Sequence, residues 1–285
     1  MRVKKVLLKD GSAVPSIGQG TWKLGEDPDS EKTEMAALRE GIEHGLTLID
    51  TAEMYGEGRS ETLVGKAIRE YDRDSLFLVS KVLPYNAGRN HIFDSCEASL
   101  RRLNTDYLDL YLLHWPGNVP LSETVDCMEE LVSRGLIRRW GVSNFDCEDM
   151  KHLSSYDTEG HCATDQVLYH VASRGVEYDL LPMMRSIKMP MMAYCPLAQA
   201  GSLRDGLFSD PVLRRIAEEH EATVAQILLA FDTRDNDIIA IPRSGNPKHA
   251  VENASAVEIQ LSNHDIELID REFPAPTSRE PLDIV

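Results

Sequence analysis

Short apolar runs alternate with segments of helical periodicity almost from one end of the chain to the other. Turn-forming residues bound each run, as is typical of buried strands. The runs occupy residues 16–21, 46–50, 76–81, 107–114, 137–143, 162–168, 190–195 and 237–242. Because strands that alternate with helices pair in parallel through crossover connections, this order predicts an α/β fold.

The number of strand–helix units decides between two α/β architectures. Eight units in a chain of 285 residues match a (β/α)8 TIM barrel. A doubly wound sheet usually has fewer strands and a Gly-rich first turn. We therefore expect one barrel domain over residues 1–285, with an N-terminal β-hairpin that turns at Asp10-Gly11 and an additional C-terminal helix over residues 262–273.

The helical segments between the runs carry recognisable boundary signals. Segments 30–45, 60–71, 122–135 and 209–231 have helical periodicity. Ser30, Ser60 and Ser122 each stand where a capping side chain is expected. Asp232 and Thr233 fall where the pattern predicts apolar helix, so the boundary near them is the weakest.

The chain is strongly acidic, with a formal net charge of −17. Such a surface repels phosphate backbones, so nucleic acid is not an expected partner, and an anionic cofactor needs a local cluster of basic residues. The acidic residues are spread along the helical segments, which favours an ordinary solvated surface over adaptation to high salt.

The chain also lacks membrane and secretion signals. No apolar run approaches the roughly 18–20 residues of a membrane span, and the N-terminal stretch is shorter than the ~7–15 residues of a signal-peptide core. The five cysteines are scattered and include no CxxC, which favours reduced thiols. We expect a cytoplasmic protein without membrane partners, and a monomer as its oligomeric state.

Polar side chains end the predicted strands. In a barrel these ends face a common mouth, where catalytic sites are built. Burying such groups after apolar runs is costly unless they have partners. Asp50, Lys81 and His114 end three neighbouring strands, which predicts that they act together. The full set of strand-end residues is Asp50, Lys81, His114, Ser143, Asn144, Gln166 and Tyr194.

Two kinds of barrel chemistry fit this set poorly. Metal-dependent hydrolysis needs several His and carboxylate ligands, whereas the nine histidines include no HxH or HExxH and only His114 ends a strand. We therefore expect no metal. A Schiff base through Lys81 requires a depressed lysine pKa, and a nearby Asp50 works against that.

Acid–base chemistry through Tyr55 fits better. The charge of Lys81 is expected to stabilise the Tyr55 phenolate and lower its pKa, while Asp50 keeps Lys81 charged and oriented. A neutral His114 could hydrogen-bond the substrate oxygen. Such a site moves a proton but carries no electrons, so reduction of a carbonyl needs a separate hydride source.

Several motifs together resemble the aldo/keto reductase superfamily. They are LIDTAEMYGEG, LVSKV, YLDLYLLHWPG, RWGVSNF, DQVLYH, AYCPLAQAG and IPRSGNPKHAVEN, in the family's order from about Gln19 to the tail. The resemblance is closest to short-loop bacterial members that reduce methylglyoxal and other small aldehydes. It implies a tetrad of Asp50, Tyr55, Lys81 and His114, with Tyr55 as general acid and NADPH as hydride source.

The resemblance also implies which residues contact the cofactor and the substrate. Tyr194 would stack on the nicotinamide, Ser143, Asn144 and Gln166 would bind its carboxamide, and the loop of residues 198–203 would pass over the pyrophosphate. The cofactor set is Thr21, Trp22, Asp50, Ser143, Asn144, Gln166, Tyr194, Cys195, Leu197, Gln199, Arg243, Ser244, Asn246, His249, Glu252 and Asn253. The substrate pocket is Trp22, Tyr55, Tyr85, His114 and Trp115.

Some positions depart from the common family pattern. Arg243 stands where lysine is frequent, and His249 where an arginine often grips the 2′-phosphate. Arg243 and Lys248 still supply positive charge, so NADPH is expected and NADH stays possible. Asp165 replaces a usual asparagine and needs a partner. Cys195 replaces a frequent serine, and we expect its thiol to be inert.

The glycines of Gly56-Glu57-Gly58 suggest a phosphate-binding loop, but the third glycine is missing and the preceding strand ends at Asp50. We expect them only to turn the chain.

The sequence thus predicts a reductase of small aldehydes, 2-oxoaldehydes or ketones. The alternative is a cofactor-binding regulatory protein on the same barrel, which need not keep Tyr55 beside Lys81.

Overall fold

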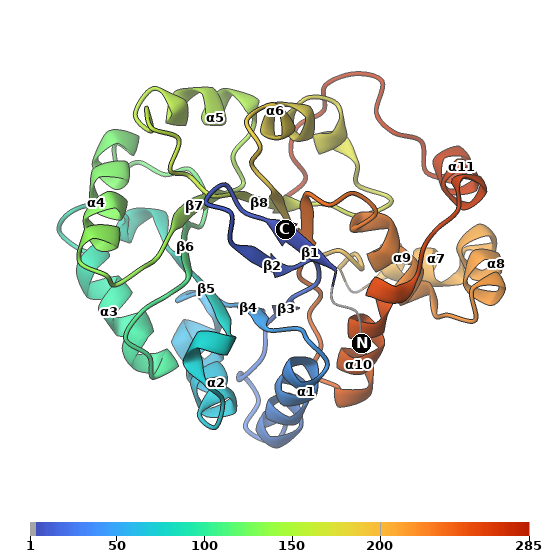
Figure 1. The fold of residues 1–285 in the computed structure, drawn as a ribbon, viewed down its shortest axis with the longest axis horizontal. Helices are drawn as coiled ribbons and strands as arrows, with labels where there is room; N and C mark the ends of the chain where they lie inside the picture. Colours follow the sequence, from blue (N-terminus) through green and yellow to red (C-terminus); the bar gives the residue numbers. More distant parts are fainter. Residues whose placement is uncertain (1–3, 200, 285) are drawn as a thin grey trace.

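The chain forms a closed ring of parallel strands surrounded by helices (Figure 1), seen in a computed structural model that describes residues 4–199 and 201–284. The eight strands pair in chain order from β3 to β10. Parallel bridges from Ile17 to Ala240 and from Gly20 to Arg243 join the first strand region to the last and close the barrel. The predicted (β/α)8 fold is confirmed.

All barrel strands are short, and each coincides with a predicted run. They are β3 (Gln19–Gly20), β4 (Leu48–Asp50), β5 (Phe77–Val82), β6 (Leu110–Leu113), β7 (Trp140–Ser143), β8 (Asp165–Leu168), β9 (Met191–Tyr194) and β10 (Ile238–Ala240). Alternate residues of a strand face opposite sides. In β6, Leu110 and Leu112 therefore belong to the apolar cluster inside the barrel, and Tyr111 and Leu113 to the cluster under the helices.

The predicted N-terminal hairpin is also confirmed, as β1 (Lys5–Leu7) and β2 (Ala13–Pro15). Val6, Leu8 and Val14 pack on the apolar residues inside the barrel, among them Leu48 at the start of β4 and Ala163 just before β8. The hairpin thus covers the end of the barrel where the strands begin. The opposite end, where the strands finish, is left for the site.

Helices cover the outside of the barrel. They are α1 (Glu31–Glu43), α2 (Arg59–Ile68), α3 (Ile92–Leu103), α4 (Leu121–Ser133), α5 (Cys147–Ser154), α6 (Leu180–Ser186), α7 (Ser202–Ser209), α8 (Pro211–Glu219), α9 (Val224–Asp232), α10 (Pro247–Ser255) and α11 (Asn263–Glu272). Short 3₁₀ helices are η1 (Tyr55–Gly58), η2 (Arg73–Ser75), η3 (Pro84–Asn86), η4 (Gly175–Glu177) and η5 (Ala256–Glu258). The final helix α11 confirms the additional C-terminal helix.

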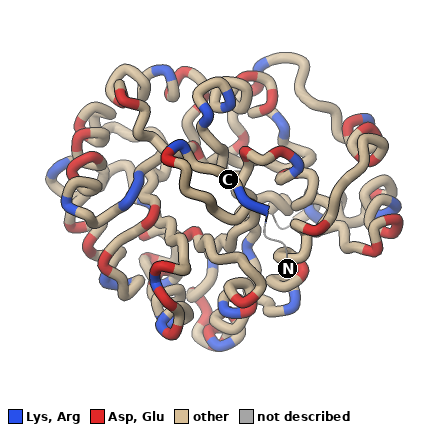
Figure 2. The backbone as a smooth tube through the Cα atoms, in the orientation of Figure 1, with Lys and Arg blue, Asp and Glu red and all other residues tan. Residues whose placement is uncertain are grey.

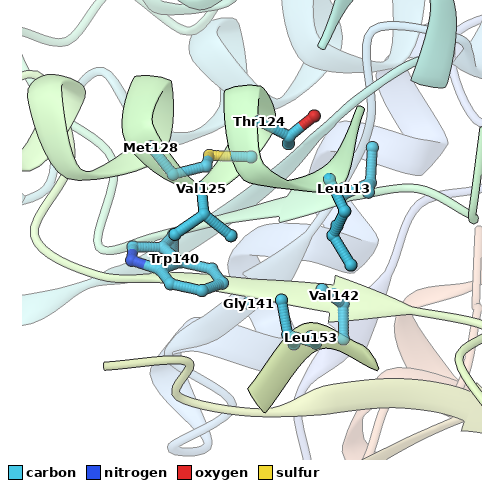
Figure 3. A pocket seen from close by; sticks show the side chains of 9 residues that line it. Leu113, Thr124, Val125, Met128, Trp140, Gly141, Val142 and Leu153 are labelled. Atoms are coloured by element: carbon cyan, nitrogen blue, oxygen red, sulfur yellow. The ribbon is translucent and has the colours of Figure 1, made fainter. Parts of the chain in front are cut away.

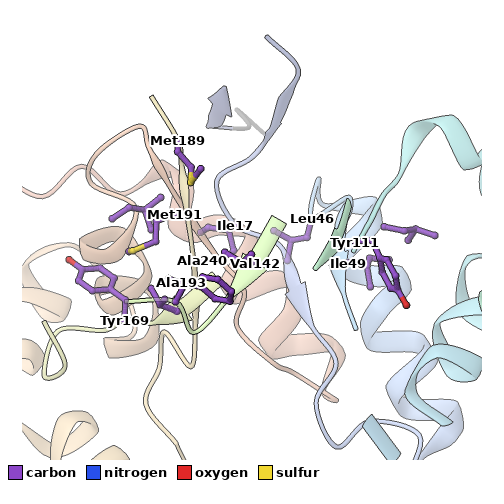
Figure 4. Packing of buried hydrophobic residues seen from close by; sticks show 14 of the residues in the cluster. Ile17, Leu46, Ile49, Tyr111, Val142, Tyr169, Met189, Met191, Ala193 and Ala240 are labelled. Carbon is purple, nitrogen blue, oxygen red and sulfur yellow. The ribbon is translucent and has the colours of Figure 1, made fainter. Parts of the chain in front are cut away.

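Apolar side chains fill the layer between strands and helices (Figure 4). Ile17, Ile49, Val142 and Ala240 come from different strand regions and are each buried there. A small gap of about 10 Å³ lies between α4 and the strands β6 and β7 (Figure 3). This gap is lined almost entirely by apolar side chains and is too small to hold a ligand.

Three of the predicted capping serines do not cap. Ser30 precedes α1 without a side-chain cap bond, and α4 follows Pro120 rather than starting from a Ser122 cap. The Ser60 hydroxyl instead donates to the backbone oxygens of Thr21 and Leu24. A buried hydroxyl close to two backbone carbonyl oxygens bonds to them in preference to a helix end.

The predicted helix at 209–231 is two helices, α8 and α9, with a turn between them. Asp210 caps α8 and Thr223 caps α9 through their side chains. Asp232 is the last residue of α9, and Thr233 follows it as the C-cap. Asp232 is fully buried there, and neither of its carboxylate oxygens has a hydrogen-bond partner in the described part of the chain.

Charges of both signs are distributed around the outer surface, over helices and loops (Figure 2). This agrees with the expected solvated surface. All five cysteines are free thiols, as expected, and four of them are buried. In the described part of the chain, no helix combines the length and the apolar character that crossing a membrane requires.

Candidate active site

A chain of hydrogen bonds joins three of the predicted tetrad residues at the carboxyl end of the barrel. Asp50 is the last residue of β4, and Lys81 is the next-to-last residue of β5, which pairs with it. Lys81 Nζ donates to Asp50 Oδ1 over 2.6 Å and to the Tyr55 hydroxyl oxygen over 3.1 Å. Both members of the ion pair are buried, with Lys81 fully enclosed.

The third N–H of the Lys81 ammonium donates to the backbone oxygen of Thr51 over 2.9 Å. All three donors of the ammonium are therefore used. Burial would lower the pKa of Lys81, but Asp50 and Tyr55 more than offset burial and hold it above its ordinary value. A lysine that stays protonated is a poor nucleophile, so the geometry argues against a Schiff base.

Burial raises the pKa of Tyr55, although Lys81 acts to lower it. Lys81 therefore acts in the predicted direction, but the pKa of Tyr55 is raised on balance rather than lowered. Burial disfavours the phenolate more strongly than one neighbouring ammonium stabilises it, and the negative charge of Asp50 adds to the effect. Tyr55 therefore carries its proton at neutral pH, which is the state that a general acid needs.

His114 completes the group and is neutral. It follows β6, and its ring meets that of Tyr55 edge-on with centroids 5.7 Å apart. Burial, with a further contribution from the charge of Lys81, lowers the pKa of His114 to about 2. The imidazole is uncharged at any ordinary pH, as predicted. Its Nδ1 atom is buried without a hydrogen-bond partner among the described residues.

Two contacts that support this site were not predicted from the sequence. Gln166 Nε2 donates to Asp50 Oδ2 over 2.8 Å, across 116 residues of chain. Glu53 Oε1 accepts from the backbone N–H of Leu83 and the side chain of Asn86, which ties η3 to the loop between β4 and Tyr55. Neither contact has a local sequence signal, because each depends on how distant loops meet.

A second network joins the ends of β7 and β9. Asn144 has a positive φ of 60°, a conformation that asparagine tolerates better than most residues. Its Nδ2 donates to the backbone oxygen of His114 and to Ser143 Oγ, each over 3.1 Å. Tyr194 Oη donates to Asn144 Oδ1 over 2.8 Å. The structure therefore brings Ser143, Asn144 and Tyr194 together beside His114.

The model of the Aldo/keto reductase family matches residues 16–272 of the chain. The chain belongs to the aldo/keto reductase family. It is 51% identical over 285 residues to methylglyoxal reductase YeaE of Escherichia coli (strain K12), with 100% of both chains covered. It is 35% identical over 267 residues to glyoxal reductase of Bacillus subtilis (strain 168), with 93% of this chain and 91% of that protein covered.

Solved structures agree with this assignment. An aldo/keto reductase from Klebsiella pneumoniae, crystallised in complex with NADP and acetate, is 53% identical and has a TM-score of 0.96, with 100% of both chains covered. An aldo-keto reductase from Klebsiella pneumoniae in complex with NADPH gives the same identity, TM-score and coverage.

In this aldo/keto reductase, the glycines after Tyr55 turn the chain, as predicted. Gly56 and Gly58 have φ angles of +56° and +85°, and Gly58 is directly followed by α2. A side chain at Gly58 would collide with Arg102, whose Cδ lies 2.6 Å from an added Cβ. The turn holds Tyr55 beside Lys81, so these glycines position the tyrosine.

The segment from Arg243 to Asn253 follows β10 and begins α10. Arg243 is exposed, and its guanidinium has no ion-pair partner among the described residues. Asn246 caps α10 by accepting from the backbone N–H of Lys248, and Ser244 Oγ bonds the backbone of Asn246. His249 is exposed, Asn253 is buried, and Glu252 lies 3.7 Å from Lys248. A free cation at a helix start suits a phosphate.

The other predicted cofactor residues lie nearer the barrel mouth. Thr21 is buried and its hydroxyl donates to the backbone oxygen of Asp50. Leu197 is buried, and Cys195 and Gln199 are half-buried. Burial raises the pKa of the Cys195 thiol to about 11, which agrees with the expected inert thiol. Ala200, within the predicted pyrophosphate loop, lies outside the described residues.

The predicted pocket aromatics differ in exposure. Trp115 stacks at a tilt on His114 with ring centroids 4.8 Å apart, and Trp22 is half-buried. Tyr85 on η3 is 67% exposed. Only Trp115 has a ring contact with the tetrad, so Trp22 and Tyr85 stay predictions as substrate residues.

Among the described residues, Asp165 has no cationic partner. It is fully buried on β8, its Oδ1 accepts a long 3.5 Å bond from the backbone N–H of Phe145, and its Oδ2 has no hydrogen-bond partner in this part of the chain. Burial raises the pKa of Asp165 well above its ordinary value, and Asp149 and Asp146 add to this. Burial therefore favours the protonated carboxyl, which is similar in shape and charge to the asparagine that the family resemblance leads us to expect here.

Two further features of the described chain lie away from the tetrad. A cavity of about 260 Å³ lies between residues 171–175 and the C-terminal segment, with Arg174 and Glu272 in its wall. Glu129, Asp157 and His161 are the one group of three potential metal ligands among the described residues, within 4.8 Å of one another. The carboxylates of this group already accept hydrogen bonds, Glu129 from the indole N–H of Trp140 and Asp157 from two backbone N–H groups.

Proposed function

We propose that this aldo/keto reductase uses NADPH to reduce the carbonyl of small aldehydes, 2-oxoaldehydes such as methylglyoxal, or ketones, with Tyr55 as general acid. The observation that carries the proposal is the hydrogen-bonded chain from Asp50 through Lys81 to Tyr55. A protein that only binds a cofactor has no need to bury the Asp50–Lys81 ion pair. Nor does it need a tyrosine hydroxyl within hydrogen-bond distance of that lysine.

The side chains divide the work as follows. Tyr55 donates its proton to the carbonyl oxygen, and the adjacent Lys81 ammonium stabilises the phenolate that remains. Neutral His114 hydrogen-bonds the same oxygen, and Asp50 keeps Lys81 charged. When bound, NADPH supplies the hydride.

The described residues fit a phosphorylated dinucleotide. The chain has a net charge of −17, yet Arg243 carries an unpaired guanidinium beside the start of α10. Free of a protein carboxylate, this side chain suits a phosphate oxygen. Relatives from Klebsiella pneumoniae crystallised with NADP or NADPH add support. We extend the proposal to Ser143, Asn144, Gln166 and Tyr194 as nicotinamide contacts.

The substrate class rests on relatives and on the site. The chain is half identical to a methylglyoxal reductase of Escherichia coli and one-third identical to a glyoxal reductase of Bacillus subtilis. The substrates in these two names, methylglyoxal and glyoxal, are a small 2-oxoaldehyde and a small dialdehyde. We also propose a single-domain monomer in the cytoplasm, in keeping with five free thiols.

The test is oxidation of NADPH in the presence of methylglyoxal by wild type and Tyr55→Phe. Loss of the general acid should reduce the rate by about 10²–10⁴-fold. Tyr111→Phe is the matched control, because the Tyr111 hydroxyl is buried in the outer layer without a partner among the described residues. An active Tyr55→Phe enzyme would refute the mechanism, and wild type inactive on every carbonyl would favour the regulatory alternative.

A further inference from the structure

One carboxylate at the barrel mouth holds a turn of the next loop closed. Glu53 Oε1 accepts from the backbone N–H of Leu83 over 2.8 Å and from Asn86 Nδ2 over 3.0 Å. Leu83 directly precedes the 3₁₀ helix η3, and Asn86 is its last residue. A single oxygen therefore bonds to both ends of the turn, and the turn opens only if both hydrogen bonds are lost.

Glu53 is itself fixed beside the catalytic lysine. Its backbone N–H donates to the backbone oxygen of Lys81 over 3.4 Å, which extends the pairing of β4 with β5 beyond the end of β4. The side chain of Glu53 then takes the N–H of Leu83, further along the same strand direction. The carboxylate is thus anchored to the end of β5, two residues before Tyr55 in the chain.

Two further contacts hold the loop of residues 83–91. Pro84 packs against the loop after β6, where a Cβ added to Gly117 would lie 2.3 Å from Pro84 Cβ, which leaves no room for a side chain. At the far end of the loop, the backbone N–H of Arg89 donates to Glu123 Oε1 over 2.8 Å. η3 is therefore held between the loops after β4 and β6, which carry the catalytic side chains.

This anchored turn carries an exposed aromatic side chain. Tyr85, in the middle of η3, is 67% exposed. An aromatic ring on a fixed turn loses little conformational entropy when it binds a ligand, so it makes a good binding surface. Met54 on the loop after β4 is 39% exposed, and Trp115 on the loop after β6 is half-buried. Apolar groups thus border the site on three neighbouring loops.

We propose that Glu53 is a positioning residue that holds η3 in place, so that Tyr85 offers a fixed apolar contact to the part of the substrate beyond the carbonyl. This inference rests on the proposed function and adds a substrate class to it, aldehydes with an aryl group a few carbons from the carbonyl. Glu53 acts through the turn and touches neither the carbonyl nor the cofactor. Its effect therefore falls on KM for such aldehydes rather than on proton transfer from Tyr55.

The test compares two aldehydes with the same reacting group. Propanal and 3-phenylpropanal differ by a phenyl ring on the third carbon, so their carbonyl groups have nearly the same reactivity. The wild type should reduce 3-phenylpropanal with a kcat/KM about tenfold higher, mostly through a lower KM. Methylglyoxal is the reference substrate, because its reduction tests the proposed function without the aryl contact.

Glu53→Met removes both hydrogen bonds at a similar side-chain length. It should raise KM for 3-phenylpropanal about 5–10-fold, while kcat, KM for propanal and Kd for NADPH change much less. Glu53→Gln should restore most of the preference, because its amide oxygen can still accept from two neutral N–H donors. Glu97→Met is the matched control, since Glu97 on α3 is half exposed and pairs with Arg101 at the surface.

Tyr85→Ala shows whether Glu53 acts through η3. Alone, it should raise KM for 3-phenylpropanal about tenfold. Combined with Glu53→Met it should add little, because both changes remove the same contact. Tyr156→Ala is the control, since Tyr156 is 42% exposed just after α5, at the end of the barrel where the strands begin. Losses that add in the double variant would overturn the route through Tyr85.

Asn86→Ala is the second test and serves if Glu53→Met fails to fold. It removes one of the two hydrogen bonds to Glu53 and leaves the one from Leu83. KM for 3-phenylpropanal should therefore rise about 2–3-fold, with KM for propanal nearly constant. A folded Asn86→Ala enzyme with the wild-type preference would contradict the role of the turn.

The outcomes distinguish this inference from the proposed function. Wild type that turns over no carbonyl defeats the proposed function, whatever the variants do. Wild type that reduces methylglyoxal but does not prefer 3-phenylpropanal to propanal defeats this inference alone. An equal loss of kcat with both aldehydes in Glu53→Met would place the effect of Glu53 at Tyr55 instead of η3, and would also overturn it.

Discussion

Lys81 donates a hydrogen bond to the Tyr55 hydroxyl over 3.1 Å, from the end of β5 to the 3₁₀ turn that follows β4. The tyrosine oxygen thus accepts from Lys81 and keeps its own proton free to donate. Burial holds that proton on Tyr55, and the ammonium is in place to stabilise the charge once the proton leaves. This geometry supports the proposal that Tyr55 donates its proton and argues against a resting phenolate.

Replacing Lys81 with methionine should abolish most of the activity. The change removes the charge that stabilises the Tyr55 phenolate and leaves Asp50 buried without its cation. We expect reduction to slow by about 10²-fold or more and unfolding free energy to fall by about 3–5 kcal/mol. Rates of NADPH oxidation and thermal unfolding measure the two effects.

Lys66→Met is the control for that experiment. Lys66 on α2 is paired with Glu31, but both side chains are nearly half exposed to solvent, so the pair contributes little to stability. Its loss should change neither activity nor melting temperature appreciably. A Lys81→Met enzyme that retains a third of wild-type activity would contradict the assigned role.

His114→Gln should make the fold less sensitive to acid. The folded protein holds His114 neutral down to a pKa of about 2, whereas an unfolded histidine takes up a proton near pH ~6.5. The unfolded state binds more protons below that pH, so wild-type stability falls as pH decreases. Between neutral pH and about pH 5, His114 should lower the free energy of unfolding of the wild type by about 2 kcal/mol. The variant should not show this decrease.

Denaturant unfolding at about pH 7 and about pH 5 measures that difference. His170 is the comparison site, because burial lowers its pKa to about 4 and His170→Gln should show the same effect. His152→Gln is the control, since His152 is exposed on α5. An equal acid loss in His114→Gln and wild type would mean that His114 is charged in the folded protein.

The strand order and the strand-end residues could be predicted from the sequence, because both follow from local periodicity. Each predicted apolar run contains its strand, except that β5 extends one residue beyond its run, to Val82, and Asp50 and Lys81 meet because neighbouring strands end together. The contact from Gln166 to Asp50 could not be predicted in this way. It spans the barrel, and its formation depends on how the ring closes.

Other predictions were wrong because tertiary contacts compete with local preferences, and the sequence pattern shows only the local preferences. The sign of the Tyr55 pKa shift depends on how deeply its hydroxyl is buried, which overrides the nearby charge of Lys81. Ser60 is a good capping residue by type, but two carbonyl oxygens of the loop after β3 take its hydroxyl. In both cases tertiary contacts outweighed a correct local preference.

Asp165→Asn should stabilise the protein at neutral and alkaline pH. Burial raises the pKa of Asp165, so the folded state keeps a proton that the unfolded state releases above about pH 4. Stability is therefore lost as pH rises through this range, and an uncharged asparagine avoids the loss. We expect a gain of about 1 kcal/mol or more at about pH 7.

Denaturant unfolding across a pH series checks this expectation. Asp106→Asn, at an exposed position, is the control and should leave the stability profile of the wild type in place. The gain from Asp165→Asn should grow with pH and vanish at acidic pH. A gain that is constant with pH would mean that Asp165 is not the group that titrates.

Arg243→Ala should weaken NADPH far more than NADH. Arg243 is exposed, has no ion-pair partner among the described residues and lies beside the start of α10, where a phosphate would be stabilised. A charge-assisted contact to the 2′-phosphate is worth about 1.5–3 kcal/mol, so its loss should raise the Kd for NADPH about 10–100-fold. NADH lacks this phosphate and serves as the internal control. Equal weakening of both cofactors, measured by fluorescence titration, would place Arg243 at the shared pyrophosphate or adenine instead.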